Sequence, residues 1–194
     1  MGRRAKITRK SISDSAIRLV VQEGAPKATM RAISSNMAVN EAALYRHYKS
    51  KEELLASAYV GIVEEMAREK AHLAKSNLPF RELVREWIRL TYTYFDRNPD
   101  AFAYVLLVPP PNSVIASGVT KVQGQLFLAL IRHAIKKGEI RPIAPKLVFA
   151  HFSGVMLSIP RLIREGVLRG PASRYVAEAA DAIWRMLGSV TSGD

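Results

Sequence analysis

The residues best suited to chemistry in this sequence are basic and aromatic, and they gather in its first 51 positions. That segment holds eleven lysines and arginines against three acidic residues, a net charge of +8, whereas the other 143 residues carry +4. So uneven a distribution favours a polyanionic partner for the N-terminal quarter of the chain. A basic tail that only improves solubility would explain the composition equally well.

Three side chains near the end of this segment suit contact with a phosphate backbone. The ring of Tyr45 can pack on a sugar while its hydroxyl donates to a phosphate oxygen. His47 follows within reach of a backbone or a base edge, although a plain surface histidine is the alternative. Lys51 falls in the first turn of a predicted helix, where the dipole and a cation together favour an anion. These residues predict binding of nucleic acid.

The sequence contains no motif typical of an enzyme active site or a metal site. It has no cysteine, and its four histidines (His47, His72, His133 and His151) lack the spacing of metal ligands. It has neither a glycine-rich phosphate loop nor a Gly-x-Ser-x-Gly motif. We therefore expect no cofactor, no metal and no catalytic residue, with a small helical enzyme as a minor alternative.

Nothing in the sequence predicts secretion or membrane insertion. Residues 11–21 contain Asp14, Arg18 and three serines, so no apolar core of a signal peptide is present. The most apolar stretch, Leu147–Ile163, is interrupted by glycine, proline and charge and falls short of the roughly 20 residues that span a bilayer. We expect a soluble, cytoplasmic protein without a membrane partner.

Apolar residues recur at helical period along nearly the whole chain, and no segment alternates as a strand does. The predicted fold is all-α, with about nine helices. The first ends at Gly24, and the others cover about 30–37, 41–48, 51–73, 80–95, 100–108, 114–137, 146–165 and 171–190.

Thr29, Asn40 and Ser50 are the predicted N-caps of the second, third and fourth helices. Since Ala38 is not glycine, we expect the turn before the third helix to close without a positive φ.

Residues Ile33 to Leu54 resemble the N-terminal signature of TetR-family transcriptional regulators. That signature reads approximately Ile-Ala, two variable residues, Ala-Gly-Val-Ser, a small pair, Leu-Tyr, an aromatic, and Ser-Lys-Glu-x-Leu. Here Leu44-Tyr45 and Ser50-Lys51-Glu52-x-Leu54 stand at the matching spacing. The close resemblance covers about residues 9–55, and it departs from the family at Ser34, Met37, Ala38 and Asn40.

The resemblance implies a helix-turn-helix whose second helix enters the major groove of DNA. Residues at the start of that helix would influence base choice, and Thr29 and Lys51 would bind phosphates. A basic N-terminal arm would follow the backbone or enter the minor groove. The expected DNA-binding residues are Arg3, Arg4, Thr29, Arg31, Asn40, Glu41, Ala42, Ala43, Tyr45, Arg46, His47 and Lys51.

By the same resemblance, residues 75–194 form a ligand-binding bundle whose last two long helices pair with a second subunit. Residues 1–52 form the DNA-binding domain, and a helix over about 51–73 bridges the two. Candidates for the ligand pocket are side chains on apolar helix faces that carry a polar or polarisable group. They are Trp87, Thr91, Tyr94, His133, His151 and Met156.

The expected function is that of a bacterial regulator that binds double-stranded operator DNA as a homodimer. As a repressor it would be released by a small, largely apolar ligand. A basic helical adaptor that binds an acidic protein or a membrane surface is the alternative, because it would use the same positive charge.

Overall fold

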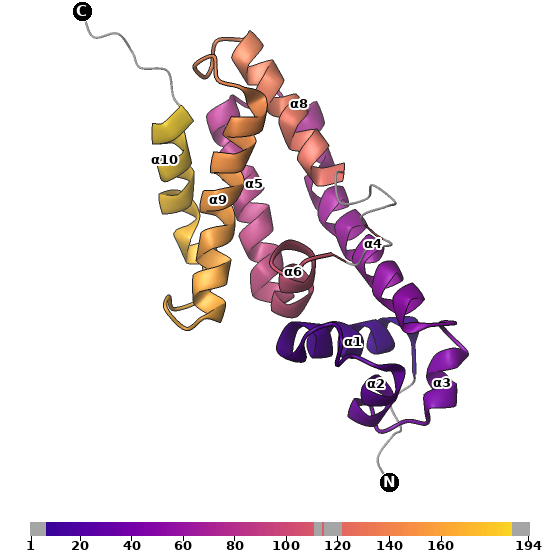
Figure 1. Cartoon of the computed structure of the whole chain (residues 1–194). Coiled ribbons are helices and arrows are strands. Elements are labelled where there is room, and N and C mark those ends of the chain that lie inside the picture. Colours follow the sequence, from indigo (N-terminus) through magenta and orange to yellow (C-terminus); the bar gives the residue numbers. More distant parts are fainter. Residues whose placement is uncertain (1–6, 111–113, 115–121, 188–194) are drawn as a thin grey trace, which may run out of the picture. The chain divides into compact units, whose positions relative to one another are not determined.

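The computed structural model describes residues 7–110, 114 and 122–187 (Figure 1). These residues form nine α-helices and no β-strand, which confirms the predicted all-α class. The helices are α1 Arg9–Glu23, α2 Met30–Asn36, α3 Glu41–Tyr45, α4 Lys51–Lys70, α5 Phe80–Arg97, α6 Pro99–Leu106, α8 Val122–Lys136, α9 Pro145–Arg164 and α10 Val176–Leu187. Two 3-10 helices, η1 Ala71–Lys75 and η3 Ala172–Tyr175, follow α4 and precede α10.

The observed helices depart from the predicted ranges mainly at their ends. The fourth helix gives way to η1 after Lys70, and the last opens with the 3-10 turn η3. Helix α8 is described from Val122, so residues 115–121 of the predicted helix lie outside the described residues, as does Val190.

The chain forms two compact units. The first comprises residues 1–62 and 100–119, and the second comprises residues 63–99 and 120–194. Helix α4 therefore begins in the first unit and ends in the second, as a bridging helix does. The first unit also includes α6, which the boundaries expected from the sequence assign to the C-terminal domain.

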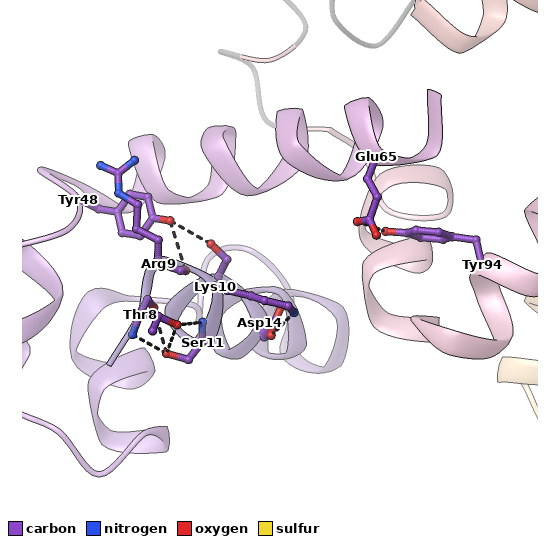
Figure 2. A network of polar contacts seen from close by, with 9 residues as sticks. Thr8, Arg9, Lys10, Ser11, Asp14, Tyr48, Glu65 and Tyr94 are labelled. Carbon is purple, nitrogen blue, oxygen red and sulfur yellow. Dashed lines mark hydrogen bonds and ion pairs between the residues drawn. The ribbon is translucent and has the colours of Figure 1, made fainter. Parts of the chain in front are cut away.

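The predicted ends of the first helices follow from capping. Helix α1 begins at a capping box in which Thr8 and Ser11 exchange hydrogen bonds of 3.1 and 3.0 Å (Figure 2). The side-chain oxygens of Thr29, Asn40 and Ser50 accept backbone N–H groups two or three residues on, at 3.1, 2.8 and 3.1 Å. All three predicted N-caps are therefore confirmed.

Helix α2 ends in a Schellman motif that closes the turn before α3. Val39 N donates to Ser34 O at 3.0 Å, and Ala38 N donates to Ser35 O at 3.1 Å. This pattern holds Ala38 in the left-handed region at φ +51°. The expectation that the turn would avoid a positive φ was wrong, because satisfying two carbonyls at the helix end outweighs the steric cost of the alanine Cβ.

Helix α6 joins the first unit through two tyrosines that bond backbone carbonyls. Tyr59 OH donates to Val105 O at 3.2 Å, and Tyr104 OH donates to Leu55 O at 3.0 Å. The two rings meet edge to face, with centroids 5.8 Å apart. Burial raises the pKa of both hydroxyls, so each stays protonated and keeps its hydrogen bond.

Helix α5 is the central helix of the second unit, since α8, α9, α10 and η3 all pack against it. Its stripe is buried from Phe80 to Phe95, as the apolar periodicity predicted. At its end the Asp96 carboxylate accepts Ala172 N at 2.6 Å and Ser173 N at 3.0 Å. This carboxylate caps η3 and so ties the segment before α10 to α5.

Helix α9 runs for 20 residues through Gly154 and Pro160. The expectation that this segment is too short to span a bilayer was wrong, because by length and composition alone the helix could cross a membrane. One such helix is weak evidence of a membrane protein. However, only 22% of its most apolar window is buried in one copy, and Leu147 is 47% exposed. The helix therefore leaves most of its apolar surface uncovered in the single chain.

Candidate DNA-binding interface and effector site

Helix α3 divides sharply into a buried and an exposed side. Leu44 is fully buried and Ala43 is 5% exposed, whereas Tyr45 is 51% exposed. Tyr48, just beyond the helix and four residues after Leu44, is also buried. The helix therefore presents Tyr45 outward from a firmly packed base, as base and phosphate contacts require.

Helix α1 holds the C-terminal end of α3 in place. Arg9 Nη2 donates to the His47 carbonyl at 2.8 Å, and its guanidinium lies 4.8 Å from the centre of the Tyr48 ring (Figure 2). The Tyr48 hydroxyl lies 3.1 Å from Ser13 Oγ. Arg9 and Ser13 are positioning residues that the sequence did not reveal, because their partners lie 35 or more positions away.

The cap residues among the predicted contacts retain donors for DNA. Thr29 and Asn40 use their side-chain oxygens as acceptors, so the threonine hydroxyl hydrogen and the asparagine amide hydrogens stay available. Lys51 Nζ donates to Ala25 O at 3.0 Å, which holds the ammonium beside the loop between α1 and α2. A phosphate would have to share or replace that bond.

The other predicted contacts fall into three groups. Arg31, Ala42 and Arg46 are exposed, and Glu41 and His47 are half-buried. Arg3 and Arg4 lie outside the described residues. Ala43 is buried, so its side chain packs within the protein, and its contribution to DNA binding stays a prediction.

The cations of this region are largely unpaired. Between residues 7 and 62 the described chain contains one ion pair, Lys10 to Asp14 at 2.8 Å. No ion pair within the described residues involves the exposed side chains of Arg18, Lys27, Arg31, Arg46 or Lys49.

In the second unit, a cavity of about 320 Å³ opens between η1, the start of α5 and α8. Its apolar lining includes Phe80, Leu83 and Leu130. Its lining also holds charges of both signs, Lys75, Lys137 and Glu139, of which the last two form an ion pair at 4.0 Å. Among the predicted pocket residues, only His133 lines this cavity. It is large enough for a small organic molecule.

The remaining predicted pocket residues lie elsewhere. Trp87, Thr91, Tyr94 and Met156 are buried. Thr91 Oγ1 donates to Trp87 O at 2.7 Å, and Tyr94 OH donates to Glu65 at 3.2 Å (Figure 2). Burial, with the nearby Glu65 carboxylate, raises the pKa of Tyr94. His151 is exposed and does not line this cavity, so its assignment to a pocket stays a prediction.

An aromatic cluster forms the core behind the cavity. Phe127 lies 4.9 Å from Trp87, 6.2 Å from Phe80 and 3.9 Å from Phe152, measured between ring centroids. Lys70 also belongs to this core, since it is fully buried and its Nζ lies 5.6 Å from the Trp87 ring. The sequence contains a signal for this burial, because Lys70 follows Ile62 and Met66 at intervals of four and so lies on the same buried face of the helix.

No group of histidine and acidic side chains that could hold a metal occurs within the described residues.

Comparison with known proteins identifies the N-terminal part of the chain. Residues 12–58 match the model of the bacterial regulatory proteins of the tetR family. The nucleoid occlusion factor SlmA of Marinobacter nauticus is 24% identical over 95% of this chain and 96% of its own length. SlmA of Vibrio atlanticus is 24% identical over 86% of each.

Solved structures show that the fold of the whole chain is that of TetR regulators. The ketosteroid transcriptional regulator KstR2 of Mycobacterium tuberculosis has a TM-score of 0.78, at 15% identity over 95% of this chain and 97% of that protein. The regulator FadR of Bacillus subtilis, solved with stearoyl-CoA, has a TM-score of 0.76 at 14% identity, over 91% and 97%. The chain thus carries a match to the tetR family model in residues 12–58, and its fold is that of solved transcriptional regulators.

Proposed function

We propose that this chain is a dimeric repressor that binds operator DNA through α3 and leaves it when a small apolar molecule binds the second unit. The observation that carries the proposal is the exposed Tyr45 on a buried helix base, in a unit whose exposed cations, apart from Lys10, form no ion pair among the described residues. An exposed aromatic side chain amid unpaired positive charge suits a sugar-phosphate backbone.

In this proposal Tyr45 and the cap donors of Thr29 and Asn40 contact the sugar-phosphate backbone. Arg31, Ala42 and Arg46 lie on the exposed surface and read or exclude bases in the major groove. Arg3 and Arg4 extend the contact as a basic arm. The domain boundaries of 1–52 and 75–194 form part of the same proposal, with α4 carrying changes from one domain to the other.

Helices α9 and α10 would form the dimer interface. Helix α9 presents exposed Leu147, Ala150 and Gly154 along one face. A Cβ added at Gly154 would meet no atom within 4 Å, so the helix face there is open. Small residues at this spacing allow a second helix to approach closely, and a twofold axis would then place two recognition helices about one DNA turn apart.

A glutamate at Gly154 tests the interface without disturbing the monomer. Gly154→Glu should yield a folded monomer in analytical ultracentrifugation, because the side chain has room in one copy and none in the proposed pair. Gly61→Glu is the matched control, since Gly61 is also helical and has no atom within 4 Å of an added Cβ. A dimeric Gly154→Glu protein would refute this interface.

The effector would be a small, largely apolar molecule, held at the cavity that includes His133 and Leu130. The FadR structure in complex with stearoyl-CoA and the ketosteroid regulator KstR2 support an apolar effector by their fold. A coupling free energy of roughly 1–3 kcal/mol between the two sites would change operator affinity about 5–150-fold.

The curated relatives support a second candidate, since SlmA of Marinobacter nauticus is a nucleoid occlusion factor and aligns with nearly the whole chain. A nucleoid occlusion factor of this fold would use the same DNA-binding residues. Mapping of bound chromosomal sites distinguishes the candidates: a repressor occupies sites at promoters, including that of its own gene or a neighbour.

The proposal is tested by titrating the dimer against the DNA immediately upstream of its own gene, with scrambled duplex as competitor. We expect tight binding that survives competitor and falls steeply with salt, and Tyr45→Ala should weaken it without changing dimerisation. Equal, weak affinity for both duplexes, together with binding to anionic vesicles, would favour the basic adaptor instead.

A further inference from the structure

Lys70 is a buried cation without an anionic partner among the described residues. The whole side chain is inaccessible to solvent. Its ammonium has three donors, yet it makes one long hydrogen bond, of 3.3 Å, to the carbonyl of Met66 in its own helix. A buried ammonium normally has a carboxylate or several acceptors around it, since removal from water is otherwise costly.

The neighbouring carboxylate does not fill this role. Glu69 pairs through Oε1 with Arg97 Nη2 at 2.6 Å, and its other oxygen, Oε2, is buried without a hydrogen-bond partner among the described residues. Its charge raises the pKa of Lys70, but burial outweighs that effect and lowers the pKa to about 8. The ammonium is thus left facing an aromatic ring, the face of Trp87.

The aromatic cluster connects Lys70 to the cavity residues. Trp87 contacts Phe127 at 4.9 Å between centroids, and Phe127 contacts Phe80 at 6.2 Å. Phe80 lines the cavity. An elongated molecule that reached from the cavity along these rings would place its body against apolar side chains and its end at the Lys70 ammonium.

We infer that Lys70 is the receptor for the anionic group of the effector, which is a small organic carboxylate with an apolar body. The inference rests on the proposed function, in which the second unit binds an effector. A carboxylate supplies the acceptors that the ammonium lacks, and burial strengthens this charge-assisted pair. A neutral molecule of the same skeleton would leave the cation as it is.

The test uses the full-length Trp184→Phe protein, in which Trp87 is the only remaining tryptophan. Its fluorescence is titrated with hexanoate, decanoate and phenylbutanoate, each beside the alcohol of the same skeleton. At least one acid should bind roughly 10–100-fold more tightly than its alcohol. Lys70→Met should abolish this preference, while the matched Lys136→Met, at an exposed lysine outside the cavity, should retain it.

Failure of every acid to bind, or a preference that survives Lys70→Met, would overturn the inference. Lys70→Gln provides a second variant if the methionine does not fold. Operator binding measured without any acid separates the two hypotheses. A wild-type protein that binds its operator but no carboxylate contradicts only the role of Lys70, whereas one that binds no operator contradicts the proposed function.

Discussion

The two units of this protein differ in how many of their cations form ion pairs. In residues 7–62 a single ion pair, between exposed Lys10 and Asp14, is found among the described residues. In the second unit, by contrast, six cations have carboxylate partners within 4.0 Å. The first unit exposes most of its cations without ion pairs, whereas the second unit pairs these six and buries another, Lys70.

The difference shows which charges serve the fold and which are free for a partner. Arg97 joins α5 to α4, and Arg81 joins α5 to α10, so these cations act between helices of one unit. Exposed pairs of this kind contribute little stability each. These pairs occupy cations of the second unit, whereas no ion pair within the described residues involves the exposed Arg18, Lys27, Arg31, Arg46 or Lys49 of the first unit, which can therefore bind phosphates.

The largest expected effect comes from removing cations of the first unit. The triple variant Arg31→Ala, Arg46→Ala and Lys49→Ala should lower affinity for operator DNA about 100–1000-fold near 0.1 M salt. Each lost phosphate contact should reduce the slope of log K against log salt by about 0.9. Fluorescence anisotropy over a salt series measures both quantities.

The matched triple variant replaces paired arginines of the second unit, Arg81, Arg89 and Arg161, by alanine. Their guanidiniums bind carboxylates of the same unit, so affinity and salt slope should stay close to the wild-type values. A similar loss in both triple variants would mean that DNA binding follows total charge, and the contrast between the units would then fail.

The sequence predicted the first unit in greater detail than the second. The caps at Thr29 and Asn40 depend only on neighbouring residues, and a local sequence motif marks α3. Both could therefore be predicted from the amino-acid sequence alone. The position of α6 depends on Tyr104 bonding a carbonyl 49 residues away, and a pattern of apolar spacing does not contain that information. Of the predicted pocket residues only His133 lines the cavity, because periodicity predicts a helix face but not the neighbour that covers it.

Replacement of the buried cation should change stability by a smaller amount, and in a pH-dependent manner. Below about pH 8 the ammonium of Lys70 is charged in both states, and its burial costs the folded state about 3 kcal/mol. Between pH 8 and the ordinary pKa near 10.5 the unfolded state holds the extra proton, so the free energy of unfolding rises with pH. Lys70→Met should therefore be more stable than wild type at pH 7, with the difference shrinking towards pH 10.

Urea unfolding followed by tryptophan fluorescence measures this effect, since both tryptophans lie in the second unit. Burial also raises the pKa of Tyr92 and Tyr94, but these groups are the same in both proteins and cancel in the difference. A stability difference that is constant from pH 7 to pH 10 would contradict the buried, partnerless state of Lys70.

A carboxylate in each unit allows a closer comparison. Asp96→Ala should lower the stability of the second unit by about 1–2 kcal/mol, because two backbone N–H groups lose their acceptor. Asp96→Asn retains one acceptor and should lose less. Asp14→Ala, at an exposed ion pair of the first unit, should cost less than about 0.5 kcal/mol. Thermal unfolding followed by circular dichroism ranks the three variants by stability. Equal losses of stability in Asp14→Ala and Asp96→Ala would contradict the capping role of Asp96.

The smallest expected effect is a gain, and it lies in the turn before α3. Ala38 stands at φ +51°, where an alanine Cβ costs about 1–2 kcal/mol and glycine is free of that cost. Ala38→Gly should raise stability by about 0.5–1 kcal/mol after the greater flexibility of unfolded glycine is counted. Ala56→Gly, inside α4, is the control and should lower stability by about 1 kcal/mol.

Hydrogen exchange at the amides of α2 and α3 locates the gain in the first unit. If Ala38→Gly destabilised the protein as Ala56→Gly does, the left-handed turn would be absent in solution, and α3 would need another means of reaching its exposed orientation.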